Sequence, residues 1–297
     1  MKRTDLALEI RESIEGDDRE IRGVVLEEKL VEEERIKVTK VVIRNRKGAQ
    51  AMGKPMGTYI TLEMMGRAEE IGEKAVFQSL RKITAKQLRK MISKICENEP
   101  LPGGEKERPG ILVAGLGNRE ATPDSLGPRV VKNVSACASL CAVSPGVMAQ
   151  TGMETYDILA GIIEKVKPSI LVVVDALAAR NTARLMRTIQ ITDTGICPGA
   201  GIGNYRKALN KENIGIPVIA IGVPTVVDAE TIVENRMEDF LVEQGFSQSE
   251  IEMFLKDISK NLCALFVTPK DIDETIEKMS SAIAGALNDL LPGIKEG

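Results

Sequence analysis

An aspartate, Asp175, follows the five consecutive apolar residues Ile170 to Val174 in a chain that contains no histidine. An unbroken apolar run of this length is typical of a strand buried on both faces, as in a parallel sheet. A carboxylate beside such a strand is costly to bury unless it is paired or takes part in chemistry. The absence of histidine excludes the Ser-His-Asp triad, the Cys-His pair and the HExxH zinc site. If this chain is a hydrolase, carboxylates are therefore the leading candidates for its chemistry.

A second aspartate, Asp124, lies in the loop that follows another apolar strand, Gly110 to Gly117. Taken alone, either aspartate would more often be a turn residue or a helix cap than a catalyst. Ligands of open α/β sheets bind at the carboxyl ends of strands, and both aspartates belong to that edge. Two carboxylates in one site share a proton, so one can activate water as a base while the other donates to the carbonyl or the leaving amine. Asp124 and Asp175 are thus the predicted catalytic pair, and the sequence does not assign which of them is the base.

Two further motifs are candidates for substrate binding near this pair. Asp193 begins the Asp-Thr-Gly motif of the pepsin-like and retroviral aspartic proteases. Those proteins are all-β and need two copies of the motif, whereas this chain has one copy in an α/β context, so a strand-end or turn residue near the site is the better interpretation. The glycine-rich loop 197–207 contains Gly199, Gly201 and Gly203. It could wrap the backbone of a substrate or only connect two elements.

Two nucleotide-binding patterns are incomplete. Residues 48–55 fit the pattern GxxxxGK, but Pro55 stands where a Ser or Thr would bind magnesium, and the segment lies between strands. Gly115 and Gly117 begin a dinucleotide fingerprint whose third glycine is replaced by Glu120. Neither a phosphate loop nor a dinucleotide site is therefore expected.

The elements around the aspartates alternate between strands and helices. Apolar runs predict strands at 110–117, 170–174, 188–192 and 216–223, and amphipathic periodicity predicts helices from Pro128 and at 153–167. This order predicts an α/β fold with a mainly parallel central sheet, right-handed crossovers and flanking helices.

The two ends of the chain add further elements to this core. We expect strands at 36–43 and 58–64, joined by a loop at 48–57, to form an N-terminal β extension. Residues 68–97 are expected to form amphipathic helix in one or two pieces, and residues 11–36 to be mostly a solvated surface. Thr268 is expected to open a capping box for a last helix that buries Ile272, Ile276, Met279, Ile283, Leu287 and Leu291. We expect one α/β domain over residues 1–297.

The composition narrows the class of protein. With 43% hydrophobic and 28% charged residues, the chain resembles an ordinary soluble globular protein. A net charge of -3 and an aromatic content of 3% provide neither the basic surface nor the stacking side chains that bind nucleic acid. The N-terminus lacks the apolar core of a signal peptide, and no apolar run reaches the ~20 residues of a membrane span. Five scattered cysteines, an odd number, indicate reduced thiols and a cytoplasmic protein.

Seven long stretches of the chain match one known family in the same order. They are Arg3 to Glu9, Gly117 to Pro128, Pro145 to Thr155, Val174 to Arg180, Gln190 to Gly195, Gly222 to Ala229 and Val267 to Lys270. Together they resemble the germination protease family of spore-forming bacteria, nearly end to end. The resemblance implies a homotetrameric endopeptidase, made as a zymogen in the forespore, that degrades small acid-soluble spore proteins during germination. It also implies a fold similar to hydrogenase maturation endopeptidases, no cofactor, and the family's two proposed catalytic aspartates at Asp124 and Asp175.

The N-terminus resembles the site at which this family cuts its substrates. Those substrates are cut after the acidic residue of Thr-Glu-(Phe or Ile)-Ala-Ser-Glu, and Thr4 to Glu9 is similar to that sequence. The resemblance implies autoprocessing between Asp5 and Leu6, with residues 1–5 as a short propeptide. The alternative is that this stretch is an ordinary edge segment.

Two other functions fit the same residues. A metal-dependent peptidase could use both aspartates as ligands, and oxygen donors without histidine would favour Mg, Ca or Mn. A small-molecule enzyme of the nucleoside phosphorylase type, or a non-catalytic binding protein, could be built on the same scaffold.

Overall fold

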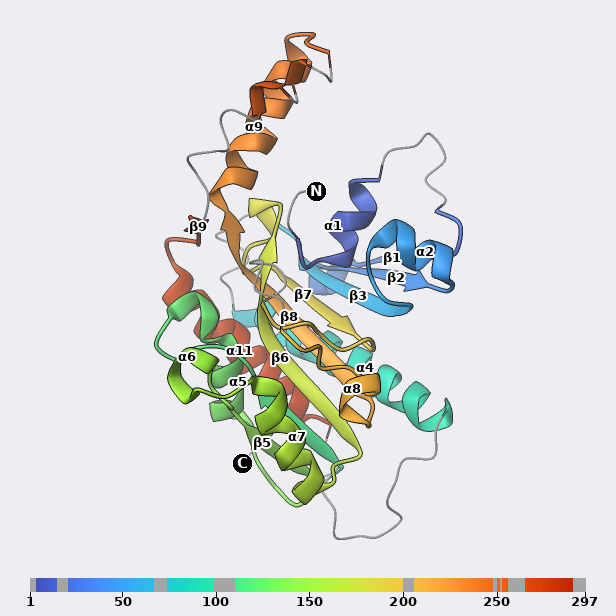
Figure 1. Cartoon of the computed structure of the whole chain (residues 1–297), viewed down its shortest axis with the longest axis vertical. Coiled ribbons are helices and arrows are strands. Elements are labelled where there is room, and N and C mark those ends of the chain that lie inside the picture. Colours follow the sequence, from blue (N-terminus) through green and yellow to red (C-terminus); the bar gives the residue numbers. More distant parts are fainter. Residues whose placement is uncertain are drawn as a thin grey trace.

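The computed structural model describes residues 4–14, 21–66, 74–98, 110–199, 206–247, 250–251, 253–255 and 265–290. Within these residues, one sheet of nine strands crosses the protein in the order β1-β2-β3-β7-β8-β6-β4-β5, with β9 paired to β8 (Figure 1). The strands are β1 Val24–Val31, β2 Ile36–Ile43, β3 Gly57–Met64, β4 Ile111–Gly115, β5 Leu140–Val143, β6 Ile170–Ala179, β7 Thr188–Thr192, β8 Val218–Asp228 and β9 Phe266–Val267.

The sheet is mixed, so the predicted mainly parallel arrangement is wrong. β5, β4, β6 and β8 are paired parallel, whereas β1, β2, β3, β7 and β8 are paired antiparallel, as are β8 and β9. The direction changes at β7, because the link from β6, residues 180–187, is too short for the helical crossover that a parallel strand needs. The α/β class itself is confirmed, and the N-terminal strands extend the central sheet through β3 and β7.

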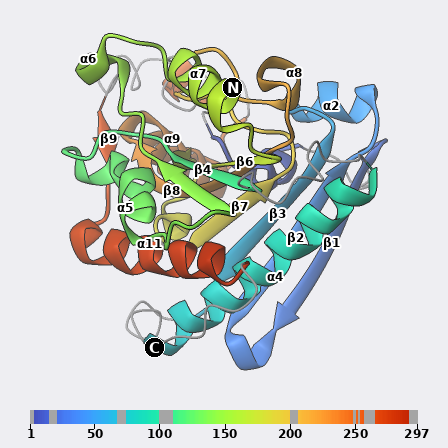
Figure 2. The same cartoon turned by 90° about the horizontal axis from the view of Figure 1, so that it is seen from below.

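Helices cover both faces of the parallel half of the sheet (Figure 2). On one face, α5 Leu126–Asn133 and α11 Ile272–Asn288 cover these strands, and α4 Lys74–Asn98 continues the helical layer beside α11 and over β3 in the antiparallel half; all three share one core with the sheet. On the other face, α7 Thr155–Val166 packs Leu159 and Ile163 against the sheet. The remaining elements are α1 Ala7–Glu12, η1 Glu32–Glu34, α2 Arg46–Met52, η2 Thr122–Asp124, α6 Met148–Thr151, η3 Thr182–Arg184, α8 Lys211–Ile214 and α9 Ala229–Glu243. Figure 1 shows α9 projecting away from the body of the protein.

Strand β6 is buried on both faces, as its apolar sequence predicts. Val172 and Val174 belong to the core shared with α4, α5 and α11, while Leu171 and Val173 belong to the core under α7. The alternation follows from the period of two in a strand. All four side chains are 0% exposed. Full burial of such a side chain contributes about 1.5–3 kcal/mol to the free energy of unfolding. The packing of these residues therefore fixes the position of Asp175, which follows them in β6.

One strand and one α-helix between residues 24 and 52 were not predicted. β1 lies in the segment expected to be a solvated surface, and it is an edge strand whose Glu27 and Glu28 side chains are exposed. Charged side chains are usual on edge strands, so the many charged residues of this segment did not distinguish a strand from a solvated loop. The segment expected as a loop begins inside α2, where Asn45 Oδ1 caps the helix by accepting from Gly48 N at 2.9 Å.

The last helix begins later than predicted. Thr268 does not cap it, because its hydroxyl donates to Thr225 O at 2.8 Å and α11 starts at Ile272. The predicted buried face is confirmed as far as Leu287. Leu291 lies outside the described residues.

Candidate active site

The sheet opens where β4 ends and β6 continues. β4 pairs with β6 as far as Gly115 opposite Val174, and Leu116 N still donates to Val174 O at 2.8 Å. Beyond this point β6 runs on to Ala179, and among the described strands it pairs there only with β8. Asp175 therefore lies inside β6 at the level where the neighbouring strand leaves the sheet. This is the carboxyl end of the parallel strands, the edge at which α/β proteins bind ligands.

Asp124 reaches the same edge from the loop after β4. It is the last residue of η2, and its Oδ2 accepts a hydrogen bond from Asn118 N at 2.7 Å. Gly117 lets the loop fold back, since its φ is +108° and a Cβ there would lie 2.0 Å from Asp124 O. Gln150 holds the loop from outside through a hydrogen bond of 2.7 Å from its Nε2 to Asn118 Oδ1. The backbone of this loop thus fixes the position of the Asp124 carboxylate.

The two predicted aspartates line one cavity of about 390 Å³. Burial raises the pKa of Asp175 well above its ordinary value, and the charges of Asp124 and Asp5 raise it further, against the hydrogen bond from Ala176 N at 3.0 Å. Burial also raises the pKa of Asp124, although its backbone hydrogen bond and the charge of Arg206 oppose this rise. Two interacting carboxyl groups with raised pKa values hold a proton between them.

Arg206 is a cation beside the pair that the sequence analysis missed. Its charge lowers the pKa of both Asp124 and Asp175. Its backbone O accepts a hydrogen bond of 3.1 Å from Cys197 Sγ, which joins the two ends of the glycine-rich loop. The position of Arg206 near the end of a glycine-rich loop is the feature of the sequence from which its role could have been predicted. Of the three loop glycines, Gly199 lines the cavity, and Gly201 and Gly203 lie outside the described residues.

The N-terminal segment lies in the same cavity. Asp5 lines it, with its N donating to Ala178 O at 3.0 Å and its Oδ2 accepting from Ala178 N at 2.9 Å. Burial raises the pKa of Asp5. Leu6 is 0% exposed and packs in a cluster with Leu177 and Val227. The structure thus brings the residue before the predicted cut to the predicted catalytic pair.

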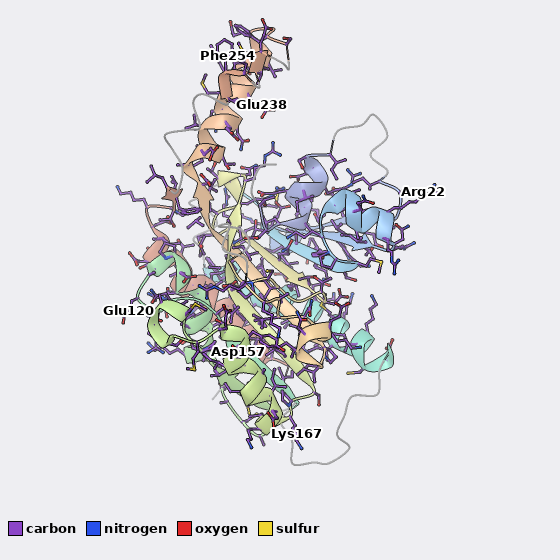
Figure 3. All side chains as sticks on the ribbon, viewed as in Figure 1. Arg22, Glu120, Asp157, Lys167, Glu238 and Phe254 are labelled. Atoms are coloured by element: carbon purple, nitrogen blue, oxygen red, sulfur yellow. The ribbon has the colours of Figure 1, made fainter. Side chains whose placement is uncertain are left out.

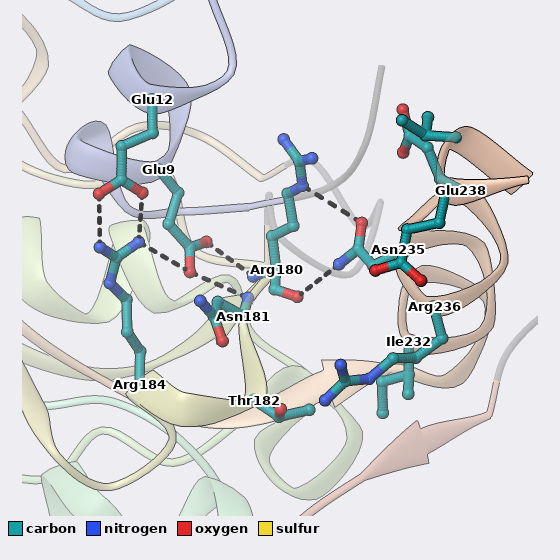
Figure 4. A pocket seen from close by; sticks show the side chains of 12 residues that line it. Glu9, Glu12, Arg180, Asn181, Thr182, Arg184, Ile232, Asn235, Arg236 and Glu238 are labelled. Atoms are coloured by element: carbon teal, nitrogen blue, oxygen red, sulfur yellow. Dashed lines mark hydrogen bonds and ion pairs between the residues drawn. The ribbon is translucent and has the colours of Figure 1, made fainter. Parts of the chain in front are cut away.

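A network around Glu9 holds α1 against the end of β6 (Figure 4). The Glu9 carboxylate is buried and accepts hydrogen bonds from Arg180 N at 2.7 Å and Asn181 N at 3.0 Å. Arg184 forms ion pairs with Glu9 at 3.4 Å and with Glu12 at 2.7 Å. These residues border a cavity of about 930 Å³ that the paired aspartates do not line. The network therefore anchors the N-terminal segment and is separate from the aspartate pair.

Asp193 is not brought to the pair. Its Oδ1 accepts a hydrogen bond from Thr58 N at 2.7 Å, which joins the end of β7 to β3. It lines a different cavity, together with Lys94. The Asp-Thr-Gly motif is thus a turn at the end of a strand, and Asp193 lines a cavity that neither Asp124 nor Asp175 lines.

The fold and the cavity define a class of site. Two coupled carboxyl groups at the edge of an α/β sheet, beside a bound chain segment, are suited to hydrolysis by acid and base groups. In the described part of the chain, no group of three or more His, Cys, Asp or Glu side chains could hold a metal ion. No helix among the described residues has the length and apolar character needed to cross a membrane.

Comparison with known proteins identifies the family. A family model of the germination protease matches residues 1–262. The chain is 42% identical to the germination protease of Clostridium perfringens, over 96% of this chain and 94% of that relative. It is 40% identical to the germination protease of Caldanaerobacter subterraneus subsp. tengcongensis, over 99% of this chain and 95% of that relative. It is 36% identical to the germination protease of Bacillus cytotoxicus, over 97% of this chain and 93% of that relative. The chain therefore belongs to the germination protease family, as its motifs led us to expect, and it is a protease.

One solved structure is similar in part. It is the crystal structure of HycI, a NiFe hydrogenase maturation protease from Thermococcus kodakarensis. The match has a TM-score of 0.36 and 18% identity, and it covers 66% of this chain and 98% of HycI.

Proposed function

We propose that this protein is an endopeptidase that begins the degradation of small acid-soluble spore proteins during germination, in the spore core. It cuts after the acidic residue of sites similar to Thr-Glu-(Phe or Ile)-Ala-Ser-Glu. Family membership supports a protease of spore germination. The observation that carries the mechanism is that Asp5, Asp124 and Asp175 line one cavity. An acidic residue of a peptide segment therefore lies beside two carboxyl groups able to activate water.

In the proposed reaction, Asp124 is the base and Asp175 is the acid. Asp175 keeps the shared proton because burial raises its pKa well above the ordinary value. The Asp124 carboxylate, held by Asn118 N, takes a proton from water. The water oxygen then bonds to the carbonyl carbon, and Asp175 gives its proton to the leaving nitrogen as the carbon–nitrogen bond breaks. The products are a carboxylic acid and an amine; the leaving nitrogen carries the proton of Asp175, and Asp124 carries the proton taken from water.

The same reaction on the protein's own chain would cut between Asp5 and Leu6 and release residues 1–5 as a propeptide. Asp5 fits the acidic position before the cut, since Ala178 N binds its carboxylate at 2.9 Å. Asp5 N also donates to Ala178 O at 3.0 Å, a backbone contact of the kind that holds an added strand. A substrate's acidic residue would take the same place once the propeptide has left, with Gly199 in the wall of the cavity.

The test is cleavage of a purified small acid-soluble spore protein. Asp124→Asn and Asp175→Asn are each expected to lower the rate at least about 100-fold and keep the fold, because each removes an acid or base group. Asp157→Asn, which removes an exposed carboxylate from α7 (Figure 3), is the matched control with an unchanged rate. Mass spectrometry identifies the fragments, and circular dichroism checks folding.

Three results of this test would contradict the proposal. Near-normal turnover in Asp124→Asn or Asp175→Asn removes that residue from the mechanism. A spore protein left intact by the wild-type enzyme contradicts the proposed substrate. Fragments that end in residues other than Glu or Asp contradict the proposed specificity.

A metal-dependent peptidase is the alternative mechanism, with the same aspartates as ligands. Full activity after exhaustive chelation would exclude it. Activity lost on chelation and restored by Mg or Mn would favour it, since oxygen ligands suit these ions. Family membership favours a protease over the enzyme of nucleoside phosphorylase type.

A further inference from the structure

Two side chains donate hydrogen bonds to the backbone oxygen of Asp5. Lys54 Nζ lies 3.0 Å from this oxygen, and Gln190 Nε2 lies 3.2 Å from it. The oxygen belongs to the peptide bond between Asp5 and Leu6. Neither Lys54 nor Gln190 has a part in the mechanism described above.

Lys54 is held in place by the turn that ends α2. Gly53 ends the helix in the left-handed conformation, with a φ of +56°, and Lys54 N donates to Ala49 O at 3.2 Å. Pro55 follows, and its ring restricts the backbone on the other side of Lys54. The segment with the incomplete phosphate-loop pattern thus presents its lysine to a peptide oxygen.

Gln190 lies in β7, with its side chain buried between the N-terminal segment and the sheet. Its Oε1 accepts a hydrogen bond of 2.7 Å from Ala7 N, so its amide nitrogen is directed towards Asp5 O. One side-chain amide therefore holds the chain on both sides of the bond between Asp5 and Leu6.

Asp5 borders two cavities. The cavity of about 390 Å³ contains Asp124 and Asp175, and a second cavity of about 270 Å³ contains Lys54 and Gln190. Asp5 lines both of them. The carboxyl groups and the hydrogen-bond donors therefore line separate cavities that meet at Asp5, and attack on a carbonyl carbon and binding of its oxygen need both sets of groups at one peptide bond.

We propose that Lys54 and Gln190 form an oxyanion hole for the peptide bond that the aspartates hydrolyse. This inference rests on the proposed function. When the water oxygen bonds to the carbonyl carbon, the electron pair of the carbonyl π bond moves onto the oxygen, which becomes negatively charged. The ammonium group and the amide N–H stabilise this charge more than they stabilise the neutral carbonyl. When the bond to nitrogen breaks, the pair returns to re-form the carbonyl, and the nitrogen receives the proton of Asp175.

The surroundings of Lys54 favour strong hydrogen bonds. Burial lowers the pKa of Lys54, and the charge of Asp5 opposes this shift. Poor solvation strengthens a hydrogen bond to a charged oxygen. Mildly acidic solution favours the protonated amine, which is the form that donates.

The test follows the cut between Asp5 and Leu6 in the full-length protein, by intact-mass spectrometry after a shift to mildly acidic pH. Lys54→Met removes the ammonium and keeps an apolar stem, while Gln190→Glu removes the donor and keeps an acceptor for Ala7 N. Each is expected to slow the cut about 100- to 1000-fold, the loss typical of one oxyanion-hole donor. Lys54→Arg is expected to cut about tenfold faster than Lys54→Met, because it retains a charged donor.

A matched control and a fold check accompany these variants. Lys40→Met removes a surface lysine of β2 that pairs with Glu27, and the rate of the cut is expected to stay that of the wild type. Thermal unfolding shows whether each variant is folded. If Lys54→Met does not fold, the test is the rate of the cut after Asp5 in Gln190→Glu.

Three results would overturn the inference. The first is a wild-type rate in either folded donor variant, and the second is an equal rate in Lys54→Met and Lys54→Arg. The third is a wild-type protein that stays uncut after Asp5, even where it degrades an acid-soluble spore protein. Failure of the proposed function is seen separately, as an intact spore protein or as an unaffected Asp175→Asn.

Discussion

The charge state of Asp175 links the stability of the protein to pH. Burial, with the charges of Asp124 and Asp5, raises its pKa well above the ordinary value of 3.8. The folded protein therefore binds a proton that the unfolded chain releases. Such a group contributes stability that is complete below its unfolded pKa and is lost as the pH rises through its folded pKa.

Asp175→Asn removes this dependence and keeps an oxygen that can accept from Ala176 N. We expect the variant and the wild type to unfold at similar temperatures near about pH 4, and the variant to be more stable near about pH 8, because each unit of pKa shift corresponds to about 1.4 kcal/mol. The expected gain in Tm is at least about 2 °C. Thermal unfolding across this range measures it, and Asp157→Asn should show no such gain. A variant less stable than the wild type at the higher pH would contradict a raised pKa.

The aspartates of the site could be predicted from the sequence, but their partners could not. Asp124 follows an apolar strand and Asp175 follows an apolar run within β6, and both are local patterns. Lys54, Gln190 and Arg206 come from three other parts of the chain, and only the fold brings them to Asp5 or to the pair. Residues this far apart in the sequence form no motif with a fixed spacing, so the sequence alone does not predict that they meet.

At the scale of elements, a long and regular apolar pattern predicted helices and strands reliably. The sequence did not show how one strand pairs with its neighbours in the sheet. α7 and β6 were predicted because each has a long and regular apolar pattern. The edge strand β1 was missed because water contacts its charged side chains. The antiparallel direction of β7 was missed because it depends on the length of a link rather than on any pattern within the strand.

The anchoring of α1 gives a prediction at this scale. Glu9→Ala removes the acceptor of two backbone N–H groups, those of Arg180 and Asn181. An unsatisfied buried group costs about 1–3 kcal/mol, so we expect a loss of at least this size in the free energy of unfolding. The cut after Asp5 should also slow, because the segment is held less firmly. Urea titration measures the first effect and intact-mass spectrometry the second.

The control for this variant is Glu27→Ala on β1, where the carboxylate is exposed and pairs with Lys40. Its free energy of unfolding should stay within about 0.5 kcal/mol of the wild type. A Glu9→Ala variant as stable as this control would show that the network around Glu9 does not hold α1.

At the scale of the whole molecule, the projecting helix α9 exposes apolar side chains. Phe240 is 54% exposed and Val242 is 57% exposed. Phe254, which Figure 3 labels on the same projection, is 43% exposed. A cluster of large apolar side chains on a protruding element is typical of a surface that contacts another protein. The homotetramer implied by the family resemblance is the assembly in which we expect this surface to be covered.

Analytical ultracentrifugation tests this expectation. The wild type should sediment as a tetramer, and a double variant, Phe240→Ser with Val242→Ser, should sediment as a smaller species because its apolar contact area is reduced. Leu26→Ser with Leu30→Ser, two exposed apolar residues of the edge strand β1, is the control with unchanged mass. A monomeric wild type would contradict the assembly, and an unchanged mass in the double variant would place the interface elsewhere.

The burial of Leu6 has a consequence for what the first cut does to the enzyme. Leu6 is 0% exposed, so hydrolysis after Asp5 would create a free amino terminus inside the protein, beside the cleft of Asp124 and Asp175. An α-amino group, with an ordinary pKa of about 7.7–8.0, becomes a cation at mildly acidic pH. A new cation favours the ionised form of nearby carboxyl groups and so lowers their pKa values. Precursor and processed enzyme would then have different pH optima, with that of the processed form shifted to more acidic solution.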